Sequence, residues 1–201
     1  MTTATWGQVT RAFSRLLVLV TVAAGLCSLS ASAAERFFSA ASRSDFVYSP
    51  TRDILYIANG DQIARYVVST GQALTPIRDP MGTFGLRHID LSIDERTLAV
   101  TDSSFNFQAR VLLVDLDSGT SSSVNFNLEP NEYGTFGVAW AHDGSLLVSS
   151  LGFGYYDQPL RRFEPATGLV EIIARVDNGT SLRANSDRSV IAVETVLTPE
   201  F

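Results

Sequence analysis

The sequence predicts an all-β fold assembled from repeated four-stranded antiparallel meanders, and three observations support this prediction. After residue 35, no run of 11 or more residues keeps the helical period of about 3.6. The apolar runs in this part are short, rich in β-branched and aromatic residues, and separated by turn residues. Two sequence markers also return every 43 to 49 residues, which indicates one supersecondary unit repeated along the chain.

The first marker is a hairpin in which an apolar strand, a polar turn and a second apolar strand follow one another. It occurs four times, as DFVYSPTRDILYI (Asp45–Ile57), HIDLSIDERTLAV (His88–Val100), GVAWAHDGSLLV (Gly137–Val148) and LRANSDRSVIAV (Leu182–Val193). The last three turns carry Asp94, Asp143 and Asp187, and Thr51 holds the aligned place in the first. An aspartate at such a place caps a turn by accepting backbone N–H bonds, so we interpret these three as structural turn residues.

The second marker is a short turn motif that ends in glycine, namely STG at Gly71, DSG at Gly119 and ATG at Gly168. Glycine supplies the positive φ that a tight hairpin requires. We expect a strand before each glycine and another after it: Ile63–Val68 and Gln72–Ile77, Arg110–Leu116 and Ser121–Leu128, Leu160–Glu164 and Leu169–Ala174. One unit therefore consists of a strand, an Asp turn, a strand, a loop, a strand, a Gly turn and a strand.

Four-stranded units of about 45 residues are typical of β-propeller blades, which bury both faces only by stacking on neighbours. Over residues 45–195 the chain resembles the bacterial YVTN and WD-type β-propeller repeats. The tetrad YIAN (Tyr56–Asn59) stands at the Tyr-Val-Thr-Asn position, and VLLVDLDSG (Val111–Gly119) stands where WD repeats carry Trp-Asp. No repeat has the Trp-Asp dipeptide, and only Asp115 retains its aspartate. The resemblance implies the fold and leaves the function open, because propellers host many activities.

The number of repeats predicts an incomplete propeller. Three complete units and the first half of a fourth are present, whereas propellers close with about four to eight blades. The simplest interpretation is that residues 35–201 are the N-terminal part of a longer run of repeats. Assembly of two half-rings is the alternative.

The first 34 residues predict a secretory signal peptide. Arg11 and Arg15 form a basic region, the apolar run LLVLVTVAAGL follows, and an A-x-A cleavage motif ends at Ala33. The apolar run is shorter than the roughly 20 residues of a membrane span. Lipid attachment at Cys27 is the alternative, and the bulky Leu26 before it disfavours that reading. We expect a secreted or periplasmic protein with no stable membrane span after cleavage.

The charge of the chain without that segment limits its partners. It keeps 13 arginines against 21 acidic residues, a formal charge of −8. A surface of this sign repels nucleic acid and anionic lipid. We therefore expect no nucleic-acid partner, and the ligand is an unknown protein or small molecule.

The two histidines of the chain each have an aspartate close by in sequence. His88 and Asp90 alternate on one face of the innermost strand of their blade, near the central channel, and are candidates for acid–base or metal chemistry. A structural contact between blades is the alternative, and two ligands alone do not make a metal site, so no metal is predicted. His142 and Asp143 lie in a repeat turn, which explains the aspartate and leaves the histidine incidental.

The sequence contains no nucleophile elbow, phosphate loop or dinucleotide fingerprint, so no catalytic residue and no cofactor are predicted. The leading hypothesis is an exported, non-enzymatic binding or interaction scaffold. The alternative that the resemblance permits is a propeller enzyme, such as a lactonase-like hydrolase or a quinoprotein-type dehydrogenase subunit, with its site in the central channel. A structural module of a larger surface protein is the third hypothesis.

Overall fold

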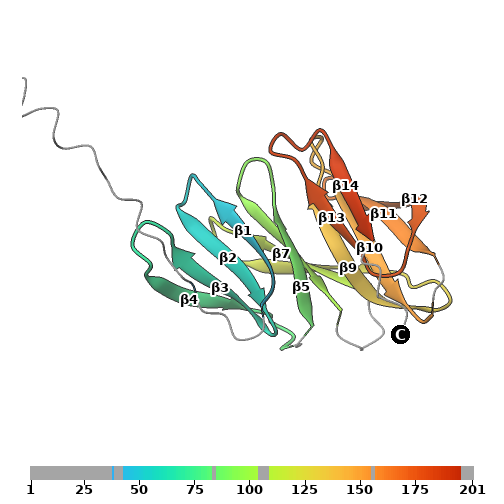
Figure 1. Ribbon diagram of the computed structural model, residues 1–201, viewed down its shortest axis with the longest axis horizontal. Coiled ribbons are helices and arrows are strands. Elements are labelled where there is room, and N and C mark those ends of the chain that lie inside the picture. Colours follow the sequence, from blue (N-terminus) through green and yellow to red (C-terminus); the bar gives the residue numbers. More distant parts are fainter. Residues whose placement is uncertain (1–37, 39–42, 83–84, 104–108, 155–156, 196–201) are drawn as a thin grey trace, which may run out of the picture. The chain divides into compact units, whose positions relative to one another are not determined.

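The computed structural model describes residue 38 and residues 43–82, 85–103, 109–154 and 157–195, which all belong to the unit Phe38–Phe201 (Figure 1). The expected signal peptide, residues 1–34 with Cys27, lies outside the described residues. Among the residues that are described, no helix has the length and apolar character needed to cross a membrane.

The described strands form four antiparallel sheets, one after another along the chain (Figure 1). Blade 1 holds β1 (Arg43–Ser49), β2 (Ile54–Asn59), β3 (Gln62–Val67) and β4 (Ala73–Arg78). Blade 2 holds β5 (Leu86–Leu91), β6 (Thr97–Asp102), β7 (Ala109–Asp115) and β8 (Ser121–Phe126). Blade 3 holds β9 (Glu132–Trp140), β10 (Leu146–Gly152), β11 (Gln158–Glu164) and β12 (Leu169–Val176). Blade 4 is a hairpin of β13 (Thr180–Ala184) and β14 (Ile191–Thr195).

In each of the first three blades, every strand pairs with the next one in sequence. The predicted all-β fold of four-stranded antiparallel meanders is therefore confirmed, and three and a half blades are consistent with an incomplete propeller. Most strand ends fall within a few residues of the predicted ones. The largest difference is β9, which begins at Glu132 rather than Gly137 because Glu132–Thr135 pair with the end of β10 across bulges.

The Asp turns share one geometry in blades 2, 3 and 4. The side chains of Asp94, Asp143 and Asp187 each accept a hydrogen bond from the backbone N–H two residues ahead, at 3.0–3.1 Å. Hydrogen bonds from the hydroxyls of neighbouring serines are the main cause that lowers the pKa of all three carboxyls. The three glycines of the second marker have φ between 72° and 74°, which is the left-handed region that glycine tolerates.

The first turn departs from this pattern. Thr51, which the sequence aligns with the turn aspartates, donates from both its backbone N–H and its hydroxyl to the carboxylate of Glu95 in blade 2. Glu95 also accepts from the Ser49 hydroxyl. A carboxylate of the neighbouring blade thus supports the turn that lacks an aspartate of its own at that place.

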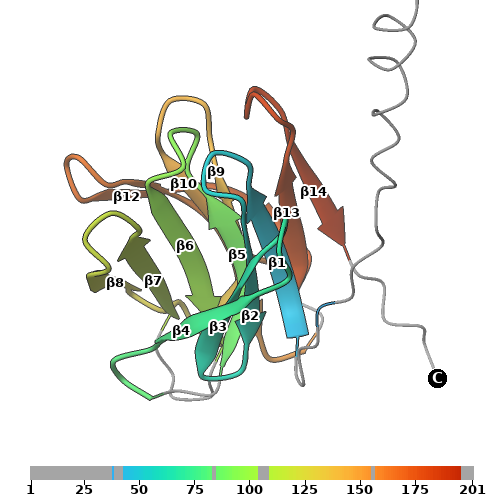
Figure 2. The same ribbon diagram turned by 90° about the vertical axis from the view of Figure 1, so that its left-hand side faces the viewer.

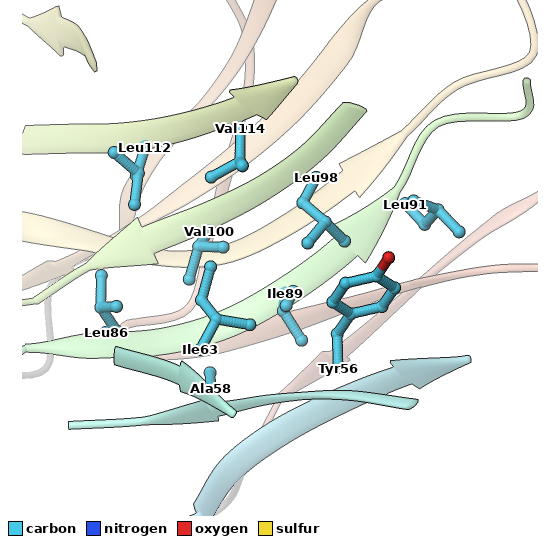
Figure 3. Packing of buried hydrophobic residues seen from close by; sticks show 10 residues of the cluster. All are labelled: Tyr56, Ala58, Ile63, Leu86, Ile89, Leu91, Leu98, Val100, Leu112 and Val114. Carbon is cyan, nitrogen blue, oxygen red and sulfur yellow. The ribbon is translucent and has the colours of Figure 1, made fainter. Parts of the chain in front are cut away.

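The hydrophobic core lies in three clusters at the seams between blades. The first strands of successive blades lie against one another, β1 on β5, β5 on β9 and β9 on β13 (Figure 2). At the first seam, side chains of blades 1 and 2 point toward one another and are fully enclosed (Figure 3). Strand β6 is buried on both faces, since Leu98 and Val100 pack toward blade 1 and Ala99 packs toward blade 3. Each middle blade therefore needs a neighbour on both sides.

Apolar side chains are exposed at both ends of this row of blades. Phe46 on β1 is 64% exposed on the face of blade 1 turned away from blade 2. At the other end, β14 of blade 4 exposes Val193, and the outer strand of blade 3, β12, exposes Leu169, Val170, Ile172 and Ile173. These surfaces resemble blade faces that further strands would cover in a closed propeller.

Candidate functional site

Charged and ring side chains gather where the first strands of the blades meet. We call Asp45, His88, Asp90, Arg183 and Arg188 the inner-strand cluster. Asp45 lies on β1, His88 and Asp90 on β5, Arg183 on β13, and Arg188 in the turn between β13 and β14. The cluster contains His88 and Asp90, which the sequence predicted to face the channel. Its other three members were not predicted from the sequence.

His88 is enclosed by three blades. Its backbone N–H donates to the Thr101 hydroxyl at 3.0 Å, and its ring lies 4.5 Å from the Phe136 ring on β9, centroid to centroid. Its Nδ1 lies 3.4 Å from Oδ2 of Asp45, which is longer than an ordinary N–H···O hydrogen bond. Within the described residues this buried nitrogen has no hydrogen-bond partner. The Asp45 carboxylate therefore lies close to this ring nitrogen without an ordinary hydrogen bond to it.

Asp45 connects blade 1 to blades 2 and 4. Its Oδ2 accepts from the Ile89 N–H at 3.2 Å and from Arg183 Nη1 at 2.8 Å. Burial acts to raise the pKa of Asp45, but the contacts with His88, Arg183 and the Ile89 amide outweigh it, so the pKa is lowered. The hydrogen bond to Asp45 in turn raises the pKa of Arg183. Both groups of this ion pair are therefore charged at neutral pH.

The carboxylate of Asp90 accepts four hydrogen bonds. Two come from backbone N–H groups, those of Leu91 and Trp140, each at 2.8 Å. Two come from the guanidinium of Arg188, at 2.5 and 3.1 Å. A carboxylate offers about four lone-pair positions, so these bonds use the full acceptor capacity of Asp90. Both oxygens of Asp90 are therefore engaged by groups of the chain itself.

The structure brings both channel candidates against the same neighbouring strand. His88 meets β9 through the Phe136 ring, and Asp90 meets it through the Trp140 amide. The partners of the two candidates were missed because they are remote in sequence. Asp45 and Arg183 are 138 residues apart, and Asp90 and Arg188 are 98 apart. Among the described residues, no group of three or more His, Cys, Asp or Glu side chains could hold a metal ion.

The second histidine makes a contact between blades. His142 Nδ1 lies 2.9 Å from the carbonyl oxygen of Asp187, and its backbone N–H donates to the carbonyl of Arg188. Asp143 bonds instead to Ser145 in its own turn and to Arg162 on β11. The adjacent histidine and aspartate thus have different partners, and His142 links the turns of blades 3 and 4.

Comparison with known proteins shows the fold. No protein-family model matches the chain, and no curated protein matches it. Hydrazine synthase of Kuenenia stuttgartiensis is similar in structure, with a TM-score of 0.60, 16% identity, and coverage of 75% of this chain and 49% of that one. The β-propeller domain of Cps50 (Swd1) from Myceliophteria thermophila gives a TM-score of 0.49, 13% identity, and coverage of 80% and 64%.

This chain therefore spans less than two thirds of either matched structure. The sheets have the architecture of β-propeller blades. At such low identity the likeness concerns the fold and not the activity. The specific YVTN family stays a prediction from the sequence.

Proposed function

We propose that this protein is an exported β-propeller scaffold that binds another molecule and does not transform it. The observation that supports this most is the state of Asp90, whose carboxylate is filled by four hydrogen bonds from its own chain. His88, the other channel candidate, is enclosed between blades and contacts Phe136 and Asp45. Both residues hold blades together in the arrangement described.

The proposal of export rests on the first 34 residues, with their basic start, apolar run and A-x-A motif. An exported protein with this fold does not depend on a disulfide, because apolar seams and ion pairs hold its blades together. The partner is a protein or small molecule, and the negative charge disfavours nucleic acid.

A double variant, His88→Ala with Asp90→Asn, separates the scaffold from an enzyme with its site in the channel. For a scaffold, the variant loses structural bonds, so we expect the thermal midpoint to fall by roughly 5 °C. Neither the variant nor the parent chain should hydrolyse a model lactone or oxidise primary alcohols in a dye-coupled assay. Cell fractionation of the parent chain should place it outside the cytoplasm.

A loss of activity without a loss of stability in the double variant would contradict the proposed scaffold function. Turnover by the parent chain that the double variant loses, with the thermal midpoint unchanged, would assign the channel to catalysis. A stoichiometric metal ion in the purified protein would point the same way. Matched controls are Arg78→Met and Glu171→Gln, which alter exposed side chains far from the inner-strand cluster.

A further inference from the structure

Asn178 ties the connection between blades 3 and 4 to blade 3. This residue lies between β12 and β13, and its Nδ2 donates to the carbonyl oxygens of Gly152 and Gly154, each at 2.9 Å. Its Oδ1 accepts from the Gly152 N–H at the same distance. Both amide hydrogens are therefore bound, and an amide side chain can supply these donors and this acceptor together. Gly152 ends β10, so one side chain holds the β10–β11 connection to the start of blade 4.

The residues next to Asn178 are tied to the same strand. The Gly179 N–H donates to the Ser150 carbonyl at 3.4 Å, and the Ser149 hydroxyl donates to the Thr180 carbonyl. Ser149 and Ser150 belong to β10. Strand β13 also lies against β9 and β10 (Figure 1). A displacement of Asn178 from its partners therefore also loosens the start of blade 4.

Asn178 is chemically labile because glycine follows it. Gly179 has no side chain to hinder an attack by its backbone nitrogen on Cγ of Asn178. In this reaction the Gly179 nitrogen gives up its proton and bonds to Cγ, the Cγ–Nδ2 bond breaks, and ammonia leaves with that proton. Water then opens the succinimide ring to aspartate or isoaspartate. The net change converts asparagine and water to aspartate and ammonia, with no oxidant or reductant.

The folded arrangement opposes this reaction. Ring closure needs Cγ to swing toward the Gly179 nitrogen, which breaks the three hydrogen bonds of the Asn178 amide. The same nitrogen must also leave the Ser150 carbonyl. Folded proteins open locally, and their terminal elements open most readily. Asn178 therefore reacts from an opened state, in which the start of blade 4 has left β10.

The product of the reaction does not restore these contacts. An aspartate at position 178 has no N–H, so its carboxylate would face the carbonyl oxygens of Gly152 and Gly154. Carbonyl groups that lose their donor and face a negative charge are unfavourable. Isoaspartate also lengthens the backbone between β12 and β13. We propose that Asn178 is a deamidation site gated by release of blade 4, and that its conversion to aspartate leaves blade 4 permanently loosened.

The rate of deamidation in the full chain tests the gate. The protein is kept in mildly alkaline buffer well below its unfolding midpoint, and peptide mass spectrometry follows the deamidated fraction at Asn178. A synthetic peptide VDNGTSL, with the sequence of Val176–Leu182, measures the unprotected rate. We expect the folded chain to react at least about tenfold more slowly than the peptide, because the reaction waits for a local opening.

Two matched core variants test whether blade 4 is the gate. Leu182→Ala leaves a cavity at the seam between blades 3 and 4, and Leu112→Ala removes the same atoms at the seam between blades 1 and 2 (Figure 3). We expect Leu182→Ala to speed deamidation of Asn178 about tenfold, and Leu112→Ala to change it less than about twofold. Asn59 also precedes a glycine but lies in blade 1, so Leu182→Ala should leave its rate unchanged.

Asn178→Asp tests the consequence of the reaction. We expect amide hydrogen exchange of β13 and β14 to become at least about threefold faster than in the parent chain, while β5 and β6 keep their rates. The matched control is Asn125→Asp, which makes the same chemical change at an exposed position of β8. This control should leave exchange in β13 and β14 unchanged.

Three other outcomes each overturn the proposal. Equal rates in the folded chain and the peptide would show that the hydrogen bonds of Asn178 do not protect it. Equal rates at Asn178 in the Leu182→Ala and Leu112→Ala chains, whether raised or unchanged, would show that release of blade 4 does not set the rate. Unchanged exchange of β13 and β14 in Asn178→Asp would show that blade 4 stays docked after the reaction.

Discussion

At the scale of single residues, buried arginines fasten the segments that connect the blades. Arg110 on β7 binds Asp79, in the connection from blade 1, and Asp102 on β6, and all three side chains are almost fully enclosed. Burial acts to lower the pKa of Arg110, but the hydrogen bonds to both aspartates outweigh it and the pKa is raised. In blade 3, Arg161 binds Glu132 and the Asn127 carbonyl of the preceding connection. The same device therefore occurs in two successive blades.

The enclosed charges predict a large effect for Arg110→Met. The substitution leaves two buried carboxylates without their partner, and we expect the free energy of unfolding to fall by about 3–5 kcal/mol. Urea unfolding at neutral pH measures it. Arg78→Met is the control, because Arg78 is 69% exposed in its pair with Asp61 and should change the value by less than about 0.5 kcal/mol. Equal losses in the two variants would show that Arg110 does not act through its enclosed ion pairs.

At the scale of elements, the sequence predicts hairpins well and side-chain partners poorly. Strand alternation and turn residues act within about ten residues, so the Asp turns and Gly turns could be located from spacing alone. The early part of β9 was missed, because Gly134 and Gly137 interrupt its apolar pattern. His88 and Asp90 were placed correctly on the inner strand β5. Their partners Asp45 and Arg188 could not be found, since only the stacking of blades brings them together.

Strand β9 offers an internal comparison of two glycines. A Cβ on Gly137 would lie 2.6 Å from the Thr180 carbonyl oxygen and 3.0 Å from the Leu182 nitrogen, both backbone atoms of β13. A Cβ on Gly134 would meet its nearest atom, Cα of Ser103, at 3.4 Å, which is an ordinary contact. Blade 4 can therefore approach blade 3 this closely only where position 137 has no side chain.

We expect Gly137→Ala to push β13 away from β9 and to destabilise the protein by about 1–3 kcal/mol. Amide hydrogen exchange of β13 and β14 should become faster than that of β5 and β6. Gly134→Ala introduces the same side chain and the same change in unfolded-chain entropy, so it is the matched control. If amide hydrogen exchange of β13 is equally fast in Gly137→Ala and Gly134→Ala, the close approach of blade 4 to blade 3 at position 137 is contradicted.

At the scale of the whole molecule, most of the contacts that cross from one blade to another join neighbouring blades, as in other repeat proteins. The inner-strand cluster is different, because the Asp45–Arg183 pair links blade 1 to blade 4 and the Asp90–Arg188 pair links blade 2 to blade 4. These two pairs connect parts of the chain that the apolar seams do not. They should make unfolding of the first and last blades more cooperative than nearest-neighbour packing alone.

The Asp45 link also predicts how stability depends on pH. The pKa of Asp45 is lower in the folded protein than in the unfolded chain, so its contribution is present above the unfolded value of about 3.9. The contribution is lost as the pH falls through the folded value.

At pH 7, Asp45→Asn should lower the free energy of unfolding by about 1.5–3 kcal/mol, because charged hydrogen bonds to Arg183 and Ile89 are weakened. Urea unfolding from pH 7 to pH 2 should show the difference between parent and variant shrinking below about pH 4. Arg175→Met removes an exposed pair with Glu129 and should give a small, nearly constant difference. A difference for Asp45→Asn that persists unchanged at pH 2 would show that Asp45 acts through its shape rather than its charge.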